Sequence, residues 1–163
     1  MIRIGLLGCG NRGTAVVQTF VNNSKNNYRI VALADLFVDQ LQKAKKRWDD
    51  VASKNGYAGI DPKLMFKGPN SFAEIANCNQ CNMIILSSPD YFHPQHLEAV
   101  VNAGKHCYCE KPITIDVEGC RKFIDIGEQA QSRLSFDVGF NVRHASFSAP
   151  INTHGEGLYK ISK

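Results

Sequence analysis

The chain has 163 residues, a net charge of +4 and a composition that is 44% hydrophobic and 21% charged. These values are typical of one soluble globular domain with a full core. The mild positive charge is too dispersed to indicate a nucleic-acid partner, and no apolar run approaches the roughly 18 residues that a membrane span needs.

The amino-terminal stretch MIRIGLLGCG differs from a signal peptide, because its apolar run is short and interrupted by glycines. We therefore expect a cytoplasmic protein whose six cysteines are free thiols. Cys78 and Cys81 have C-x-x-C spacing, but no second pair of cysteines or histidines follows to complete a zinc site. We expect plain loop thiols there, rather than metal or redox chemistry, and no bound metal.

Strand and helix patterns alternate from the first residues to about residue 140. Strands are expected at 2–7, 28–35, 82–88, 106–110 and 133–140, with at most a short one near 65–66. Helices are expected at 11–21, at 38–53, from a capping box at 71–74, from His93 to Gly104, and from a cap at Asp116 to about 131. Such alternation predicts an α/β fold, a doubly wound parallel sheet of the Rossmann type, over residues 1–142.

A G-x-G-x-x-G motif, residues 8–13, follows the first strand and opens the first helix. In that context Gly8 permits a tight turn, Gly10 lets the backbone approach a pyrophosphate, and Gly13 lets the helix pack on the strand. The helix start, with Asn11 and Arg12, adds unpaired N–H groups for phosphates. A glycine-rich turn without a ligand is the alternative interpretation.

Asp35 ends the second strand about 20 residues later, where a Rossmann domain places the acid that binds the adenosine ribose. A carboxylate there accepts from the ribose diol and repels a 2′-phosphate, and Leu36 and Phe37 offer that phosphate no cation. The sequence therefore favours NAD over NADP. A strand-end aspartate that caps the next helix is the alternative. The basic run at 43–47, in that helix, is interpreted as a solvated face rather than a phosphate-binding patch.

The turn Ser87-Ser88-Pro89 closes the fourth strand at the edge where parallel sheets bind ligands, so these residues are expected to line the cofactor cleft. His93 starts the helix that leaves the cleft. It either reaches the site or only caps the helix.

In order and spacing, these motifs resemble the glucose–fructose oxidoreductase, inositol dehydrogenase and rhizopine-catabolism (Gfo/Idh/MocA) family. The matching features are Ser88-Pro89 followed by His93, Ala-Gly-Lys-His at 103–106, Glu-Lys-Pro at 110–112, and the exit segment at 138–144. The resemblance implies a two-domain, NAD(P)-dependent oxidoreductase whose partner is a small-molecule sugar, cyclitol or related polyol.

In that family the lysine of Glu-Lys-Pro reaches toward nicotinamide and substrate, and the resemblance places this role on Lys111. An ammonium there stabilises a developing oxyanion and relays a proton, while Pro112 fixes the chain. A salt-bridging lysine at a strand end is the alternative. The residues expected to form the site are Gly8, Gly10, Asn11, Arg12, Gly13, Asp35, Ser87, Ser88, Pro89, His93, Glu110, Lys111 and Pro112.

The resemblance loosens after residue 144. The family's substrate domain supplies an Asp/His pair that this sequence lacks, so we expect residues 143–163 to be a linker and the start of such a domain. The chain is then either a piece of an enzyme or a short, catalytically incomplete NAD-binding or redox-sensing module. We expect its tail to be poorly ordered, or to pair with another copy through residues 157–161 as a homo-oligomer.

Overall fold

The protein folds around a single sheet of six parallel strands. The computed structural model describes residues 1–24, 27–130 and 134–139. The strands are β1 (Ile2–Leu7), β2 (Tyr28–Asp35), β3 (Met65–Lys67), β4 (Met83–Leu86), β5 (His106–Cys109) and β6 (Phe136–Val138). They are ordered β3-β2-β1-β4-β5-β6. This order is that of a dinucleotide-binding Rossmann fold, so the predicted doubly wound parallel sheet is confirmed.

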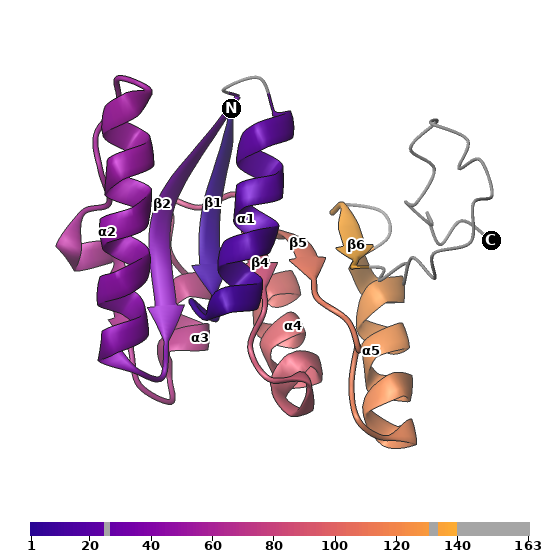
Figure 1. The fold of residues 1–163 in the computed structure, drawn as a ribbon. Helices are drawn as coiled ribbons and strands as arrows, with labels where there is room; N and C mark the ends of the chain where they lie inside the picture. The colour runs from indigo at the N-terminus through magenta and orange to yellow at the C-terminus, as the bar shows by residue number, and fades with distance from the viewer. Residues whose placement is uncertain (25–26, 131–133, 140–163) are drawn as a thin grey trace, which may run out of the picture.

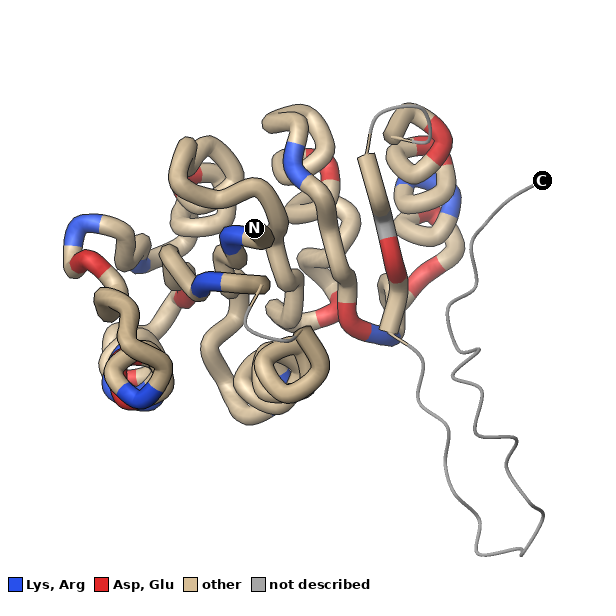
Figure 2. The backbone as a smooth tube through the Cα atoms, turned by 90° about the horizontal axis from the view of Figure 1, so that it is seen from above, with Lys and Arg blue, Asp and Glu red and all other residues tan. Residues whose placement is uncertain are grey.

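Helices cover both faces of the sheet (Figures 1 and 2). The α-helices are α1 (Asn11–Asn23), α2 (Val38–Lys54), α3 (Ser71–Ala76), α4 (His93–Asn102) and α5 (Val117–Ala130), with short 3₁₀ turns η1 (Pro62–Leu64) and η2 (Asp90–Phe92). One core lies under α1 and α2 and includes Val17 and Trp48. The other lies under α3, α4 and α5 and includes Leu97 and Phe123. Each helix therefore buries the apolar stripe that its sequence predicts.

The start of α3 differs from the prediction. Asn70, rather than Ser71, is the N-cap, and no side chain caps the helix. Ser71 is already inside the helix and is buried, with its N–H donating to the carbonyl of Gly68 at 3.1 Å. Gly68, at φ +89°, turns the chain into the helix. The capping-box interpretation of 71–74 is therefore wrong, because the turn at Gly68 fixes the start of the helix.

Two strands are shorter than the apolar runs in the sequence suggest. β4 covers four residues of the expected 82–88. At its start, the Asn82 side chain takes the place of a strand neighbour, since its Oδ1 accepts from the Arg3 N–H at 2.7 Å. β5 likewise stops at Cys109, one residue before Glu110. The shortening leaves 87–89 and 110–116 as loops at the carboxyl edge of the sheet.

The C-x-x-C segment is a turn after α3 whose two cysteines point into the core, while the two residues between them are exposed. Cys78 and Cys81 are both buried, and all six cysteines of the chain are free. Lys105 Nζ donates to the carbonyls of Cys78 at 3.0 Å and Cys81 at 2.8 Å. Burial raises the pKa of the Cys81 thiol, which keeps it protonated. These contacts agree with the expectation of structural thiols and give Lys105 a role in holding the turn.

The predictions for residues 143–163, including association through 157–161, lie outside the described residues. Among the residues that are described, no helix is long and apolar enough to cross a membrane. In the described part of the chain, Lys and Arg positions and Asp and Glu positions occur on several helices and loops (Figure 2).

Candidate functional site

The predicted site residues come together at the carboxyl edge of the sheet. Gly8 follows β1, Asp35 ends β2, Ser87 and Ser88 follow β4, and Glu110 follows β5. The first three of these strands are neighbours, and β4 pairs with β5 in parallel. Parallel strands bring their carboxyl ends to one edge, so these loops lie side by side there.

The three glycines of the motif have different surroundings. Gly8 has φ +93°, and a Cβ on it would lie 2.4 Å from the carbonyl oxygen of Ser87. A Cβ on Gly13 would lie 2.1 Å from the carbonyl oxygen of Gly8. Gly10, by contrast, has nothing within 4 Å of where its Cβ would be. Packing of the protein therefore requires glycine at two positions, while the third opens onto free space.

That free space lies in front of α1. Gly10 is the N-cap of the helix, and no side chain caps it. The first N–H groups of a helix lack partners within the helix and carry partial positive charge. An exposed, uncapped helix start beside a glycine without steric constraint fits the pyrophosphate of a dinucleotide. Asn11 and Arg12 are the first two residues of this helix, and both are exposed.

Asp35 holds two loops together at the edge of this space. Its Oδ2 accepts from the Cys9 N–H at 2.7 Å, and its Oδ1 accepts from the Phe37 N–H at 2.9 Å. Phe37 is the N-cap of α2, so the alternative interpretation of Asp35 as a helix-start residue describes part of what it does. Each carboxylate oxygen retains a further lone pair, and these are available to a diol.

The turn after β4 is fixed by two histidines. His93 is fully buried, with Nε2 2.7 Å from the Ser88 carbonyl oxygen and Nδ1 2.9 Å from the Pro112 carbonyl oxygen. Its ring therefore ties the β4 turn to the loop after β5. The cofactor contact predicted for His93 stays a prediction, and the geometry makes it a support for the residues on either side.

His96 is a residue that the sequence analysis missed. Its Nδ1 lies 2.8 Å from the Ser88 hydroxyl, and its ring stacks on Phe72 at 4.5 Å and on Phe92 at 5.7 Å between centroids. Burial, with a smaller contribution from His93, lowers the pKa of His96 to about 4. At neutral pH the ring is uncharged, so this hydrogen bond joins a neutral imidazole to the Ser88 hydroxyl. His96 and Ser88 are eight residues apart, and this spacing belongs to no motif from which the contact could be predicted.

The pKa of His96 predicts an acid-sensitive stability. An unfolded chain takes up a proton on this residue near pH 6.5, whereas the folded chain does so only near pH 4. Between these values the unfolded state binds more protons, so stability present above pH 6.5 is lost as the pH falls toward 4. Urea unfolding measured at a series of pH values should show the unfolding free energy of the wild type falling as the pH falls from 6.5 to 4. In His96→Phe, which keeps a stacked ring, this dependence should be weaker by the contribution of one proton. An unchanged slope in the variant would contradict the assignment.

The loop after β5 begins with a buried carboxylate. Glu110 is 3% exposed, and its Oε1 accepts from Arg12 Nη2 at 2.9 Å and from the Tyr108 hydroxyl at 3.3 Å. Its Oε2 accepts from the Lys111 N–H at 3.2 Å. Burial, together with Glu110, raises the pKa of Tyr108 to about 12, so the phenol stays protonated and donates. The hydrogen bond to Glu110 raises the pKa of Arg12.

Lys111 and Pro112 are exposed and are joined by a cis peptide bond. Within the described residues, the four ion pairs leave the Lys111 ammonium without a carboxylate partner. The alternative of a salt-bridging lysine is therefore not what the described part of the chain shows.

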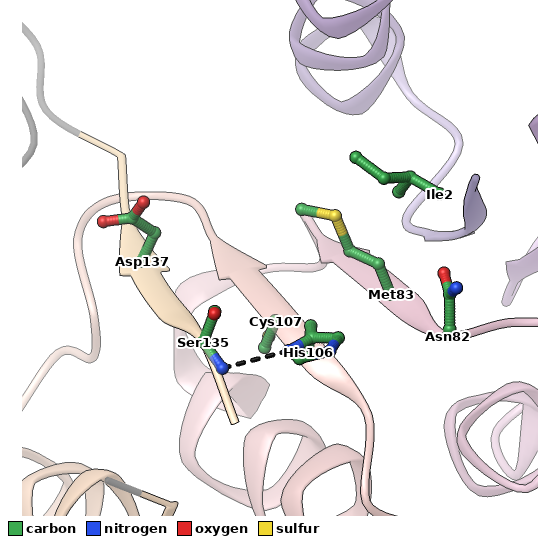
Figure 3. Close-up of a pocket in the computed structure, with 7 residues that line it drawn as sticks. All are labelled: Ile2, Asn82, Met83, His106, Cys107, Ser135 and Asp137. Atoms are coloured by element: carbon green, nitrogen blue, oxygen red, sulfur yellow. Dashed lines mark hydrogen bonds between the residues drawn. The ribbon is translucent and has the colours of Figure 1, made fainter. Parts of the chain in front are cut away.

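Two hollows lie in the described structure, one remote from this loop cluster and one that borders its glycine loop. One, of about 320 Å³, is at the amino ends of β1, β4 and β5 (Figure 3). It is lined by Ile2, Asn82, Met83, His106, Cys107, Ser135 and Asp137. The other is a groove of about 570 Å³ between α1 and α2, which reaches Cys9 and Asn11 and carries the basic run of α2. Neither includes Asp35, Ser88 or Lys111.

The order of the sheet and the loops at its carboxyl edge together define a dinucleotide-binding Rossmann domain. Residues 2–138 match the sequence model of the Gfo/Idh/MocA family, which is described as "Oxidoreductase family, NAD-binding Rossmann fold". The chain belongs to this family, as its sequence motifs predicted.

The following relatives are longer than this chain. Inositol 2-dehydrogenase from Agrobacterium fabrum is 30% identical over 143 residues, which cover 88% of this chain and 38% of the relative. Alpha-N-acetylgalactosaminidase from Shewanella oneidensis is 26% identical over an alignment of 175 positions, gaps included, which covers 98% of this chain and 35% of the relative. The structure of apo scyllo-inositol dehydrogenase from Lactobacillus casei has a TM-score of 0.66 at 25% identity, covering 85% of this chain and 36% of that one. The chain therefore spans about a third of the length of these relatives.

Proposed function

We propose that this chain binds NAD at the carboxyl edge of its sheet, as the nucleotide-binding part of an oxidoreductase for a sugar, a cyclitol or a related polyol. The observation that carries the proposal is the free space at Gly10, in front of an uncapped helix and beside Asp35. Relatives support the substrate class, since one is an inositol 2-dehydrogenase and another is a scyllo-inositol dehydrogenase crystallised with NAD(H) and scyllo-inositol.

Each site residue has a proposed task. The N–H groups at the start of α1 hold the pyrophosphate, and Asp35 accepts from the ribose diol. Bound NAD supplies the hydride acceptor. The Lys111 ammonium stabilises negative charge on the substrate oxygen and exchanges its proton. The Rossmann domain ends at residue 142 in this proposal, and residues 143–163 lead into a substrate domain.

The preference for NAD over NADP is tested by Asp35→Asn, which keeps the shape and one acceptor but removes the charge. Hydrogen bonds to a charged group contribute about 1.5–3 kcal/mol, so NAD affinity should fall about 10- to 100-fold. NADP affinity should stay level or rise, because its 2′-phosphate no longer meets a carboxylate. Isothermal titration with both nucleotides measures the two changes.

Asp39→Asn is the matched control, since Asp39 is an exposed aspartate in the first turn of α2 that pairs with Lys43. It should leave both affinities unchanged. The absence of heat with NAD or NADH in the wild type would overturn the proposal, as would NADP binding that is tighter than NAD binding.

A further inference from the structure

Two motifs far apart in the sequence meet in one half-buried ion pair. Arg12 belongs to the glycine motif and Glu110 to Glu-Lys-Pro, yet Arg12 Nη2 lies 2.9 Å from Glu110 Oε1. The Glu110 side chain is 4% exposed and the Arg12 side chain 55% exposed. A buried carboxylate requires a charged partner, whereas an arginine with half its surface in water does not. The pair therefore serves mainly to compensate the buried negative charge of Glu110. As a consequence, it also fixes the position of the Arg12 side chain.

The other end of Glu110 holds Lys111. Its Oε2 accepts from the Lys111 N–H at 3.2 Å. No amide from Lys111 to Asp116 donates to another backbone group in the described structure, so Glu110 is the main amide anchor of this loop. One carboxylate thus joins the loop that carries Lys111 to the second residue of α1.

Arg12 is part of the helix turn that faces the proposed phosphate site. It is the second residue of α1, two residues after the Gly10 N-cap. Any ordering of that turn by a bound diphosphate reaches Arg12 through the helix backbone, and reaches Glu110 through the ion pair. Tyr108 and a close approach of Gly139, whose added Cβ would lie 2.9 Å from Glu110 Oε1, prevent the carboxylate from shifting aside.

We propose that the Arg12–Glu110 pair transmits occupancy of the phosphate site to Lys111. Glu110 is then a positioning residue for the loop at 111–116, and not a cofactor ligand, because its carboxylate is buried and all of its partners are protein groups. This inference rests on the proposed NAD site. It goes further by assigning the coupling between the two halves of that site.

ADP-ribose separates direct contact from transmission. It carries the adenosine and diphosphate of NAD but has no nicotinamide, so no nicotinamide group is present to contact Lys111. Hydrogen exchange, followed by mass spectrometry on peptides spanning 111–116, should slow by at least about threefold in the wild type at saturating ADP-ribose. The double variant R12M/E110Q should show no such slowing at an ADP-ribose concentration that titration calorimetry shows to be saturating for that variant.

The double variant is chosen because removing both charges avoids a lone buried carboxylate, which protects its fold. Lys122→Met is the control, since it breaks the surface pair with Glu98 between α4 and α5, and it should retain the ADP-ribose response. A response that persists in R12M/E110Q overturns the inference, as does a wild type that binds ADP-ribose without protecting the loop. A wild type that does not bind ADP-ribose overturns the proposed function as well, which distinguishes the two failures.

Discussion

Gly10→Ala is expected to abolish NAD binding while leaving the fold intact. Gly10 has φ −70° and ψ −173°, an extended conformation that alanine adopts without strain, and no atom lies within 4 Å of the added Cβ. The methyl group would instead occupy the space through which the backbone must approach a pyrophosphate. We expect NAD affinity to fall about 100-fold or more, which is about 2.7 kcal/mol, measured by calorimetric titration.

Gly13→Ala is the matched comparison on the same loop. Its Cβ would meet the Gly8 carbonyl oxygen at 2.1 Å, so the helix must move off the strand. Overpacking of this kind costs about 1–3 kcal/mol, or about 2–9 °C in Tm for a chain of this size. Gly10→Ala should change Tm by less than about 1 °C. Wild-type NAD affinity in Gly10→Ala would place the phosphates elsewhere.

Much of the fold is predictable because each cue is local. The alternation of short apolar runs with amphipathic helices predicts parallel βαβ units, and the order of the sheet follows from right-handed crossovers. Asp116 illustrates a local cue at one residue, since its Oδ1 accepts from the Gly119 N–H at 2.6 Å at the start of α5, where a cap was expected. The prediction of the start of α3 was wrong because it relied on a side-chain pattern, whereas the backbone turn at Gly68 determines where this helix begins.

The site was predictable in position but not in its connections. The sequence places Glu110 beside Lys111, yet nothing in it indicates that Glu110 is buried or that its partner is Arg12, 98 residues away. His96 was missed for the same reason, because its contacts with Ser88 and two phenylalanines depend on how α3, η2 and α4 pack. Motifs report which residues reach the sheet edge. Tertiary packing decides which of them bind one another and which remain free for a ligand.

Arg12→Met is expected to cause a large loss of stability for a substitution at an exposed side chain. It leaves the Glu110 carboxylate buried with only two neutral donors, the Tyr108 hydroxyl and the Lys111 N–H. Removing one partner of a buried pair costs more than removing both. We expect about 2–3 kcal/mol for Arg12→Met, less than for a fully buried pair because the Arg12 side chain is half exposed. Chemical denaturation of the purified variants measures it.

The double variant R12M/E110Q decides whether burial of the charge is the cause. A neutral amide at position 110 removes the desolvation cost, so the double variant should recover more than half of the loss. Lys122→Met, which breaks an exposed pair, should cost no more than about 1 kcal/mol. If R12M and R12M/E110Q are equally unstable, the loss comes from the packing of the Arg12 side chain instead. In that case Glu110 would not depend on Arg12, and the link between the glycine loop and Lys111 would have to be sought at His93, which bonds the Pro112 carbonyl.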